Sequence, residues 1–349
     1  MLRNEVCMEK RYGKPLGDLI GIKSDFFEQN EKMLEMADGM AEALLAQPLR
    51  ENCKMCGTPL PGEALFKSHK MDYYLCPVCH HLNSGHQDTE AFANKVYIQD
   101  NYAYNYTAKD RENYKKRLEM IYVPKAKFLL ETLEKDHVSK DEIKLLDDGA
   151  GSGYFVRAMQ SLGISATGIE ISEDQVAFAN KMAEREILQQ IDSDKITEYI
   201  RKTDANVISA IGVLEHIISL HETLDAIRDN QNIQYLYLSV PMFSFSAVFE
   251  AAHQTCYNRH LGGTHTHLFS DESLQYMADQ IGFEIAGSWK FGSDIMDLYR
   301  FLCVTLEQNG NPACKEYFSE KFLPLIDQLQ MVVDQSEFAS EVHMVLKRK

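Results

Sequence analysis

The residues with the clearest chemical purpose lie in a glycine-rich turn between an apolar strand and a helix, within residues 144–155. The turn carries two acids and three glycines at alternate positions: Asp147, Asp148, Gly149, Gly151 and Gly153. Glycine permits positive φ angles and close approach of a ligand, and the following helix offers unpaired N–H groups. The next strand pattern ends at Glu170, where an acid hydrogen-bonds ribose hydroxyls in doubly wound α/β sheets. We therefore expect an adenosine-containing cofactor at this turn.

A second chemical signal comes from the spacing of the cysteines. Four of the eight form two Cys-x-x-Cys pairs: Cys53 with Cys56, and Cys76 with Cys79. Each pair presents two thiolates, so the four together match a closed tetrahedral Zn2+ site. Residues 64–75, between the pairs, predict a short hairpin whose core is too small to fold without an ion. Structural zinc is the main expectation, and rubredoxin-like iron or redox dithiols are the alternatives.

Histidines gather in one segment of the second half of the chain. Of the 12 histidines, those in residues 250–270 are His253, His260, His265 and His267. A further pair of polar residues, Glu215 and His216, follows the fourth predicted strand. Histidine is the usual general base near neutral pH, so one of these is a candidate base. Ordinary loop histidines are the alternative, and a metal site is a third reading that no i, i+4 helical pair supports.

The segments around these residues alternate between strand and helix patterns. Predicted strands cover residues 143–146, 166–171, 187–191, 205–211, 235–240, 283–291 and 341–347. Such alternation predicts an α/β fold with a mostly parallel sheet. We divide the chain into an N-terminal helical segment (1–50), a four-cysteine module (51–90), a tyrosine-rich helical connector (91–140) and the α/β domain (141–349).

The composition limits the classes of function. The net charge of −16 speaks against a nucleic-acid-binding surface, which needs a basic stripe. The N-terminus lacks the apolar core of a signal peptide. No run reaches the roughly 18 apolar residues of a membrane span, because Pro241 and Glu250 interrupt the best candidate, residues 235–252. We expect a soluble cytoplasmic protein without membrane association, and the sequence does not indicate the oligomeric state.

The D-x-G-x-G-x-G pattern from Asp147 to Gly153, with Glu170 and residues 212–216, resembles the class I S-adenosylmethionine-dependent methyltransferases over about residues 120–349. The resemblance implies a Rossmann-like seven-stranded methyltransferase sheet, with the seventh strand antiparallel between the fifth and sixth. S-adenosylmethionine would be the cofactor, with Glu170 on its ribose and Asp147 orienting its amine. The implied binding residues are Asp147, Gly149, Gly151, Gly153, Glu170, Ile171, Gly212 and Glu215. Asp148 departs from the family, where an aliphatic residue is usual, so the roles of the two aspartates stay open.

The four-cysteine module, the tyrosines and the histidine loop together resemble zinc-containing sugar C-methyltransferases and methyltransferases of polysaccharide biosynthesis. This resemblance implies a small-molecule acceptor, a sugar or sugar nucleotide, methylated at carbon or oxygen with a histidine general base. The implied catalytic residues are His216, His265 and His267, with Tyr257 in support. The resemblance also implies that aromatic residues of the connector close over the cofactor or acceptor, and packing at a domain junction is the alternative. The tyrosines concerned are Tyr97, Tyr102, Tyr104 and Tyr106.

Two other functions fit parts of the pattern. An RNA base methyltransferase can also carry a four-cysteine module, but the negative charge and the lack of a basic run near the cysteines oppose it. A non-catalytic binding protein with the cofactor fold is opposed by the intact glycines and Glu170. Residues 294–337 lengthen the usual connection between the sixth and seventh strands, and we expect a helical lid or an oligomer contact there.

Overall fold

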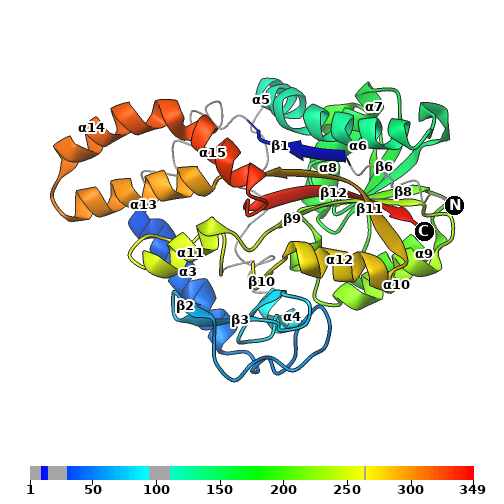
Figure 1. Ribbon diagram of the computed structural model, residues 1–349. Helices are drawn as coiled ribbons and strands as arrows, with labels where there is room; N and C mark the ends of the chain where they lie inside the picture. Colours follow the sequence, from blue (N-terminus) through cyan, green and yellow to red (C-terminus); the bar gives the residue numbers. More distant parts are fainter. Residues whose placement is uncertain (1–8, 15–29, 94–110, 263–264) are drawn as a thin grey trace, which may run out of the picture.

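The centre of the molecule is a twisted sheet of eight strands in the order β1-β11-β12-β9-β8-β5-β6-β7 (Figure 1). The computed structural model describes residues 9–14, 30–93, 111–262 and 265–349. The strands of this sheet are β1 (Glu9–Tyr12), β5 (Lys144–Asp148), β6 (Ser165–Glu170), β7 (Leu188–Gln190), β8 (Val207–Ile211), β9 (Tyr235–Pro241), β11 (Phe283–Phe291) and β12 (Glu341–Arg348). Strands β5 to β9 pair in parallel, so their carboxyl ends share the edge where such sheets bind ligands.

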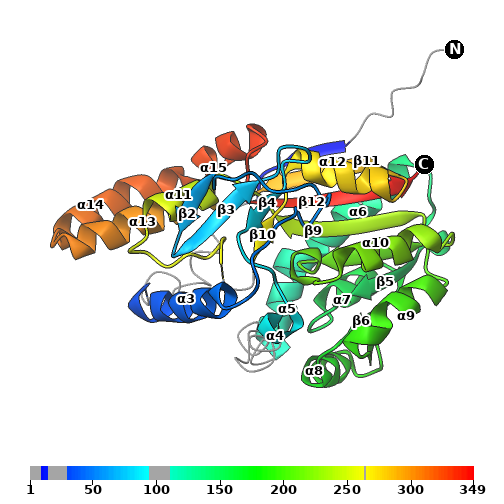
Figure 2. The same ribbon diagram turned by 90° about the horizontal axis from the view of Figure 1, so that it is seen from below.

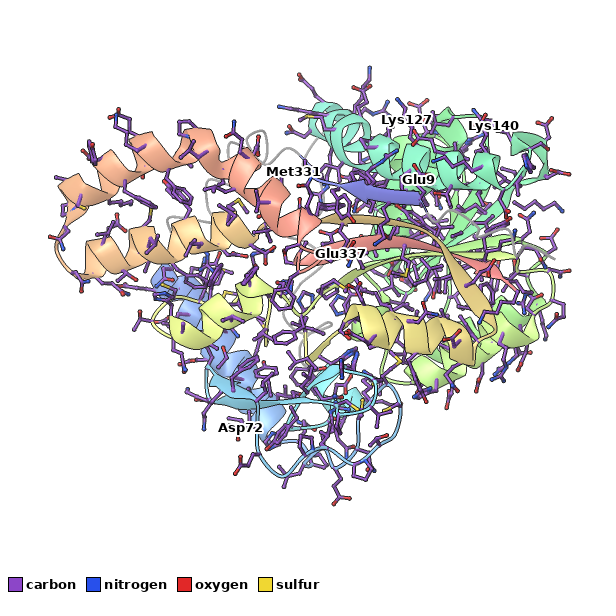
Figure 3. The ribbon with its side chains drawn as sticks, in the orientation of Figure 1. Glu9, Asp72, Lys127, Lys140, Met331 and Glu337 are labelled. Atoms are coloured by element: carbon purple, nitrogen blue, oxygen red, sulfur yellow. The ribbon has the colours of Figure 1, made fainter. Side chains whose placement is uncertain are left out.

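Strand β12 is antiparallel to both of its neighbours, β9 and β11. This confirms the expected insertion of the last strand between the fifth and the sixth. The expected total of seven strands is wrong, because β1 pairs in parallel with the outer side of β11 as an eighth. The sequence of β1 shows no apolar alternation, and side chains hold it instead. Lys10 Nζ and Tyr12 Oη lie 2.7 and 2.5 Å from Oε1 of Glu337, which is labelled in Figure 3.

Helices cover both faces of the central sheet, and alternate residues of β5 point to opposite faces. Leu145 packs in one apolar cluster with α6 and α7, and Leu146 in another with α9, α10 and α12. The helices of the first face are α5 (Arg111–Arg117), a π-helical turn (Leu118–Tyr122), α6 (Val123–Lys135), α7 (Tyr154–Ser161) and α8 (Glu173–Ala183). Those of the second are α9 (Ile196–Lys202), α10 (Leu220–Asp229) and α12 (Asp271–Gln280). Helix α12 begins with the expected cap, in which Ser270 and Ser273 bond each other's backbone N–H groups.

A second, four-stranded sheet lies beside the first, in the order β10-β4-β3-β2. Its strands are β2 (Phe66–Ser68), β3 (Met71–Leu75), β4 (Leu82–Ser84) and β10 (His267–Leu268). The expected hairpin between the cysteine pairs is confirmed as β2 and β3. The fourth strand, β10, comes from the histidine loop. Helices α3 (Asn30–Leu45), α4 (Glu90–Ala93) and α11 (Phe245–Ala252) share its apolar cluster, and Figure 2 shows α3 and α11 beside it.

Three helices lie between β11 and β12: α13 (Asp294–Gln308), α14 (Pro312–Phe322) and α15 (Ile326–Gln335). They project from one end of the sheet (Figure 1), which confirms helical structure in this extended connection. Single 3-10 turns cover Lys140–Glu142, Ser193–Lys195, Leu214–His216 and Leu323–Leu325. Across the described ranges, no helix is both long enough and apolar enough to cross a membrane. The connector tyrosines Tyr97, Tyr102, Tyr104 and Tyr106 lie outside the described residues.

Candidate active site

The glycine turn links β5 to α7 and brings backbone N–H groups to the carboxyl edge of the sheet. Gly149 and Gly153 have φ angles of +64° and +73°, in the left-handed region that favours glycine. A Cβ on Gly149 would lie 2.7 Å from the side chain of Val213, which follows β8. The turn therefore packs directly against the segment after β8, and glycine permits this close approach.

Glu170, at the end of β6, is fixed by three backbone N–H groups. Its Oε2 accepts a hydrogen bond from Gly151 at 2.8 Å, and its Oε1 accepts from Ile171 and Ser172 at 2.8 and 3.0 Å. The next side chain, Ile171, is 50% exposed and places an apolar surface beside the acid. A fixed carboxylate next to an exposed apolar group suits a ligand that carries both hydroxyls and a flat base.

Asp147 and Asp148 are both buried at the end of β5, and the alternation of the strand turns them to opposite faces. Ser209 Oγ donates a hydrogen bond of 2.6 Å to Asp147. Burial raises the pKa of Asp147 to about 7. Burial, and then the charge of Glu170, raises the pKa of Asp148 to about 7. Three acids in one small region favour a cationic ligand, because a positive charge would stabilise their ionised forms.

Aromatic rings from α5 and the π-helical turn cover the start of α7. Tyr114 Oη donates to the carbonyl oxygen of Ser152 in the glycine turn, at 3.1 Å. The ring of Tyr154 stacks on Tyr114 and Tyr122, with centroid distances of 4.3 and 4.9 Å. Nothing in the sequence pattern indicated these residues except their place on a helical run before the first strand of the domain. Tyr114 thus joins α5 to the glycine turn, and the stacked rings join the π-helical turn to α7.

The 3-10 turn Leu214–His216 meets the histidine loop. One ligand atom each from Glu215, His216 and His265 lies within 4.8 Å of the other two. The two imidazole rings are stacked, with centroids 5.3 Å apart. Burial raises the pKa of Glu215 to about 8 and lowers the pKa of His265 well below its ordinary value. The fold thus brings together two of the three histidines predicted to be catalytic, beside an acid predicted to bind the cofactor.

His267 and Tyr257 have different surroundings. The Nδ1 of His267 lies 2.9 Å from Nε2 of His81, and its ring is fully buried against the four-cysteine module. Tyr257 lies under the guanidinium of Arg300, whose Cζ is 4.1 Å from the ring centroid and whose Nη1 donates to the Tyr257 carbonyl. Both side chains therefore have packing roles, and their catalytic roles stay predictions.

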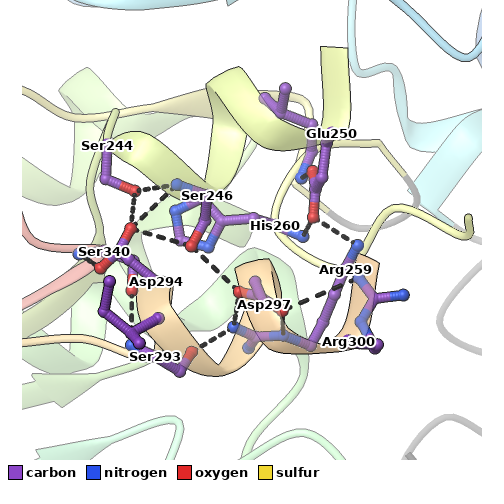
Figure 4. Close-up of polar contacts among 12 residues, drawn as sticks. Ser244, Ser246, Glu250, Arg259, His260, Ser293, Asp294, Asp297, Arg300 and Ser340 are labelled. Carbon is purple, nitrogen blue, oxygen red and sulfur yellow. Dashed lines mark hydrogen bonds and ion pairs between the residues drawn. The ribbon is translucent and has the colours of Figure 1, made fainter. Parts of the chain in front are cut away.

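A buried polar network fixes the histidine loop to the rest of the domain (Figure 4). The carboxylate of Glu250, on α11, accepts hydrogen bonds from the N–H groups of Arg259, His260 and Leu261 at 2.7, 2.7 and 2.8 Å. Arg259 Nη2 in turn lies 2.7 Å from Asp297 Oδ2 on α13. The added helices after β11 thus hold the loop that carries His265. The sequence marked Glu250 only as a charge that interrupts an apolar run.

The four paired cysteines converge on one point. Their sulfur atoms all lie within 4.8 Å of one another, with 3.6 Å between Cys53 and Cys79 and 3.4 Å between Cys56 and Cys76. A tetrahedral ion with bonds of 2.3 Å needs sulfur separations of about 3.8 Å. The two pairs form matching turns, in which the N–H of Gly57 donates to the carbonyl oxygen of Cys53 and that of His80 donates to the carbonyl oxygen of Cys76. The donor set fits a single tetrahedral ion.

A polar cavity of about 270 Å3 lies between the four-cysteine module and the turn after β8. Its lining residues are Arg50, Glu51, Asn52, Lys54, Gln87, Asp88 and Ile218. Asp88 forms ion pairs with both Arg50 and Lys54. A smaller cavity, of about 10 Å3, is lined by Asp88, Phe92, Ala93, Glu215, His216, Ile218 and Thr266. Because Asp88 and Ile218 line both cavities, the polar cavity adjoins Glu215 and His216. No sequence motif predicted the polar cavity.

Comparison with known families identifies the domain that holds this site. Residues 114–287 match the family described as "Methyltransferase domain". The protein carries a methyltransferase domain. It is therefore an enzyme, and S-adenosylmethionine is its methyl donor. The match includes the glycine turn, Glu170 and the Glu215–His216–His265 group.

Two of the solved structures similar to this chain are described as methyltransferases. A SAM-dependent methyltransferase from Archaeoglobus fulgidus is 19% identical, covering 68% of this chain and 95% of that one, with a TM-score of 0.41. Magnesium protoporphyrin IX methyltransferase from Synechocystis PCC 6803, with bound SAH, is 12% identical, covering 73% and 97%, with a TM-score of 0.45. No curated protein matches the sequence. At these identities and scores, neither structure bears on the acceptor of this methyltransferase domain.

The raised pKa values of the two aspartates lead to a prediction about donor binding. S-adenosylmethionine carries a sulfonium charge that favours ionised carboxylates, so its binding releases the protons that burial retains near pH 7. We expect affinity to increase as pH rises from 6 to 8, by about tenfold for each group of pKa near 7 that becomes fully ionised. Calorimetry at pH 6, 7 and 8 checks this.

Two comparisons sharpen that measurement. S-adenosylhomocysteine lacks the sulfonium charge, so its affinity should vary less with pH than that of the donor. The Asp148→Asn variant removes one titrating group and should show a smaller slope than the wild type. If the affinity of the wild type for the donor is constant between pH 6 and 8, these carboxyls do not sense the bound charge.

Proposed function

We propose that the enzyme transfers a methyl group from S-adenosylmethionine to a carbon or oxygen of a nucleotide-linked sugar or a related polar metabolite. The polar cavity beside Glu215 and His216 carries this proposal. Six of its lining residues have hydrogen-bonding side chains, and Ile218 is the apolar one among those named. A ligand rich in hydroxyl groups can hydrogen-bond to such a lining, whereas an apolar acceptor would displace water from these polar groups without bonding to them.

The donor side of the site follows from the glycine turn. Glu170 takes the ribose hydroxyls, and the exposed Ile171 packs on the adenine. Asp147 orients the methionyl amine. Gly149, Gly151 and Gly153 allow the donor to approach the backbone, and residues 212–215, with Gly212 and Glu215, border it from the end of β8. The nearness of the turn to Val213 supports this arrangement, because one ligand can touch both segments.

Methyl transfer is an in-line displacement, so the protein mainly aligns the acceptor with an activated donor. The acceptor atom forms a bond to the methyl carbon as the S–CH3 bond breaks, and the electron pair of that bond stays on sulfur. The acceptor also loses a proton, for which a histidine general base is suited. His216 and His265 are the favoured candidates because they lie together beside the cavity. His267 stays a further candidate for the base, and Tyr257 is assigned a supporting role.

The four cysteines bind Zn2+ in this proposal. Their convergence within 4.8 Å and the paired turns support a structural site, whose role is to keep residues 51–90 folded. That module supplies most of the polar cavity, from residues close to the cysteines in sequence. The domain division at residues 50, 90 and 140 belongs to the same proposal, with the module as the acceptor side and residues 141–349 as the donor side.

Transfer of labelled methyl groups tests the function. The wild-type enzyme, labelled S-adenosylmethionine and a panel of nucleotide sugars should give a labelled sugar product, whereas purified RNA should take up no label. Label in RNA and none in any sugar would instead favour the base methyltransferase. A matched variant, Arg50→Gln, should raise the KM for the sugar nucleotide without changing donor affinity, because Arg50 lines the polar cavity.

A further inference from the structure

Three side chains beside the acceptor cavity form a group with the composition of a metal site. They are Glu215 and His216, from the turn after β8, and His265, from the loop that precedes β10. One carboxylate oxygen and one nitrogen from each imidazole all lie within 4.8 Å of one another. Bonds of about 2.1 Å to a common ion would bring these donors to about 3.4 Å from each other. A small inward movement of side chains therefore converts the group into a coordination sphere.

The orientation of His265 supports this reading. Its Nδ1 lies 3.1 Å from the carbonyl oxygen of His260, so in the neutral ring Nδ1 carries the proton and donates it. The lone pair is then on Nε2. Metal-binding histidines almost always have this arrangement, with the second nitrogen bonded to a carbonyl or carboxylate. The network around Glu250 fixes His260, so the carbonyl that orients His265 is itself held in place.

Glu215 supplies a second, independent observation. The residue is 4% exposed, and its Oε2 has no hydrogen-bond partner among the described residues. Burial of a carboxylate oxygen without a partner is costly, and a bound cation removes that cost. Its Oε1 lies 3.8 Å from Nε2 of His216, so the acid and the imidazole face the same small space.

The space next to the group has room for a further ligand. The 10 Å3 cavity lined by Glu215 and His216 is about the size of one water molecule, and it adjoins the polar cavity. Three protein ligands with an open position are typical of catalytic rather than structural metal sites. Two imidazoles and one carboxylate suit Zn2+ and related first-row dications better than Mg2+ or Ca2+, which prefer oxygen ligands alone.

We infer that Glu215, His216 and His265 bind a divalent first-row metal ion whose open position receives an oxygen of the methyl acceptor. This inference rests on the proposed function for the identity of that oxygen. A bound cation lowers the pKa of a hydroxyl that coordinates it. The hydroxyl proton leaves to solvent, the oxygen forms a bond to the methyl carbon, and the S–CH3 bond breaks to give neutral S-adenosylhomocysteine. The two histidines then serve as ligands rather than as bases.

Calorimetric titration with Zn2+ tests the site directly. The protein is first loaded with one equivalent of Zn2+, which the four thiolates take up. The wild type should then bind one further equivalent. Glu215→Gln and His265→Ala should bind that second equivalent at least about tenfold more weakly, because each removes a ligand. The matched control is His221→Ala, which removes an exposed imidazole of α10 and should bind like the wild type.

Two results would overturn the inference. One is a wild type that takes up no second equivalent, and this measurement needs no variant to fold. The other is wild-type affinity in both Glu215→Gln and His265→Ala. The outcome is separable from the proposed function. Binding of a second zinc equivalent without methyl transfer to any sugar would support the metal site and reject the acceptor class. Full methyl transfer to a sugar without binding of a second zinc equivalent would support the acceptor class and reject the metal site.

Discussion

Replacing Glu170 by alanine is expected to weaken S-adenosylmethionine binding by about 1.5–3 kcal/mol, which is about 10- to 150-fold in Kd. The carboxylate is positioned before any ligand arrives, because three backbone N–H groups hold it at the end of β6. Charge-assisted hydrogen bonds from ribose hydroxyls to a fixed carboxylate are stronger than those between neutral groups. Alanine removes these bonds and also releases the N–H of Gly151 in the glycine turn.

Calorimetry with purified Glu170→Ala and wild type measures this loss. Glu170→Gln separates charge from shape, because the amide retains one acceptor oxygen but loses the negative charge. We expect its affinity to lie between those of the wild type and the alanine variant. A matched control is Glu198→Ala, which removes an exposed acid of α9 that pairs with Lys202. Unchanged donor affinity in Glu170→Ala would assign the ribose contact to another residue.

The proximity of the residues proposed to bind the donor could be predicted from sequence, because they are close together in the chain. The glycine turn and Glu170 end neighbouring strands of a parallel sheet, so strand order alone brings them to the same edge. The inserted antiparallel strand β12 followed from the family resemblance. The added strand β1 could not be predicted, because side chains such as Glu337, distant in sequence, stabilise it.

The acceptor half depends on contacts between distant segments, and the sequence indicated only some of its members. Two separate motifs marked His216 and His265 as candidates, but their approach was not predicted, because Glu250 and Asp297 hold the loop that brings them together. The polar cavity was not predicted, because Arg50, Lys54 and Asp88 are ordinary surface residues by sequence pattern. They become a site only when the four-cysteine module packs on the turn after β8.

The same packing joins the cysteines to the cavity and loop that we propose as the acceptor side. The sulfur atoms lie in the apolar cluster of α10 and α12, with Leu220 and Met277. Strand β4 of the module pairs with β10, which carries His267 and closely follows His265 in the chain. A loosened module would therefore disturb both the polar cavity and the histidine loop, while the glycine turn on β5 would keep its own contacts.

Cys76→Ser is accordingly expected to separate donor binding from methyl transfer. Loss of one thiolate should remove about one equivalent of zinc and unfold the module locally, because structural zinc supplies folding free energy in small domains. Displacement of the acceptor by about 1 Å costs on the order of 100-fold in rate, so transfer should fall at least that far. Affinity for S-adenosylmethionine should stay within about threefold, because the donor residues lie on the central sheet.

Metal analysis, donor calorimetry and transfer of label measure these three quantities on one preparation. The matched control is Cys314→Ser, which changes an exposed cysteine of α14 and should retain zinc, donor affinity and rate. A variant that loses zinc and donor affinity together would show that the module also supports the donor side. Two results would contradict the proposal that a structural zinc ion stabilises the acceptor half. One is wild-type protein that contains no metal, and the other is a Cys76→Ser variant that transfers methyl groups at the wild-type rate.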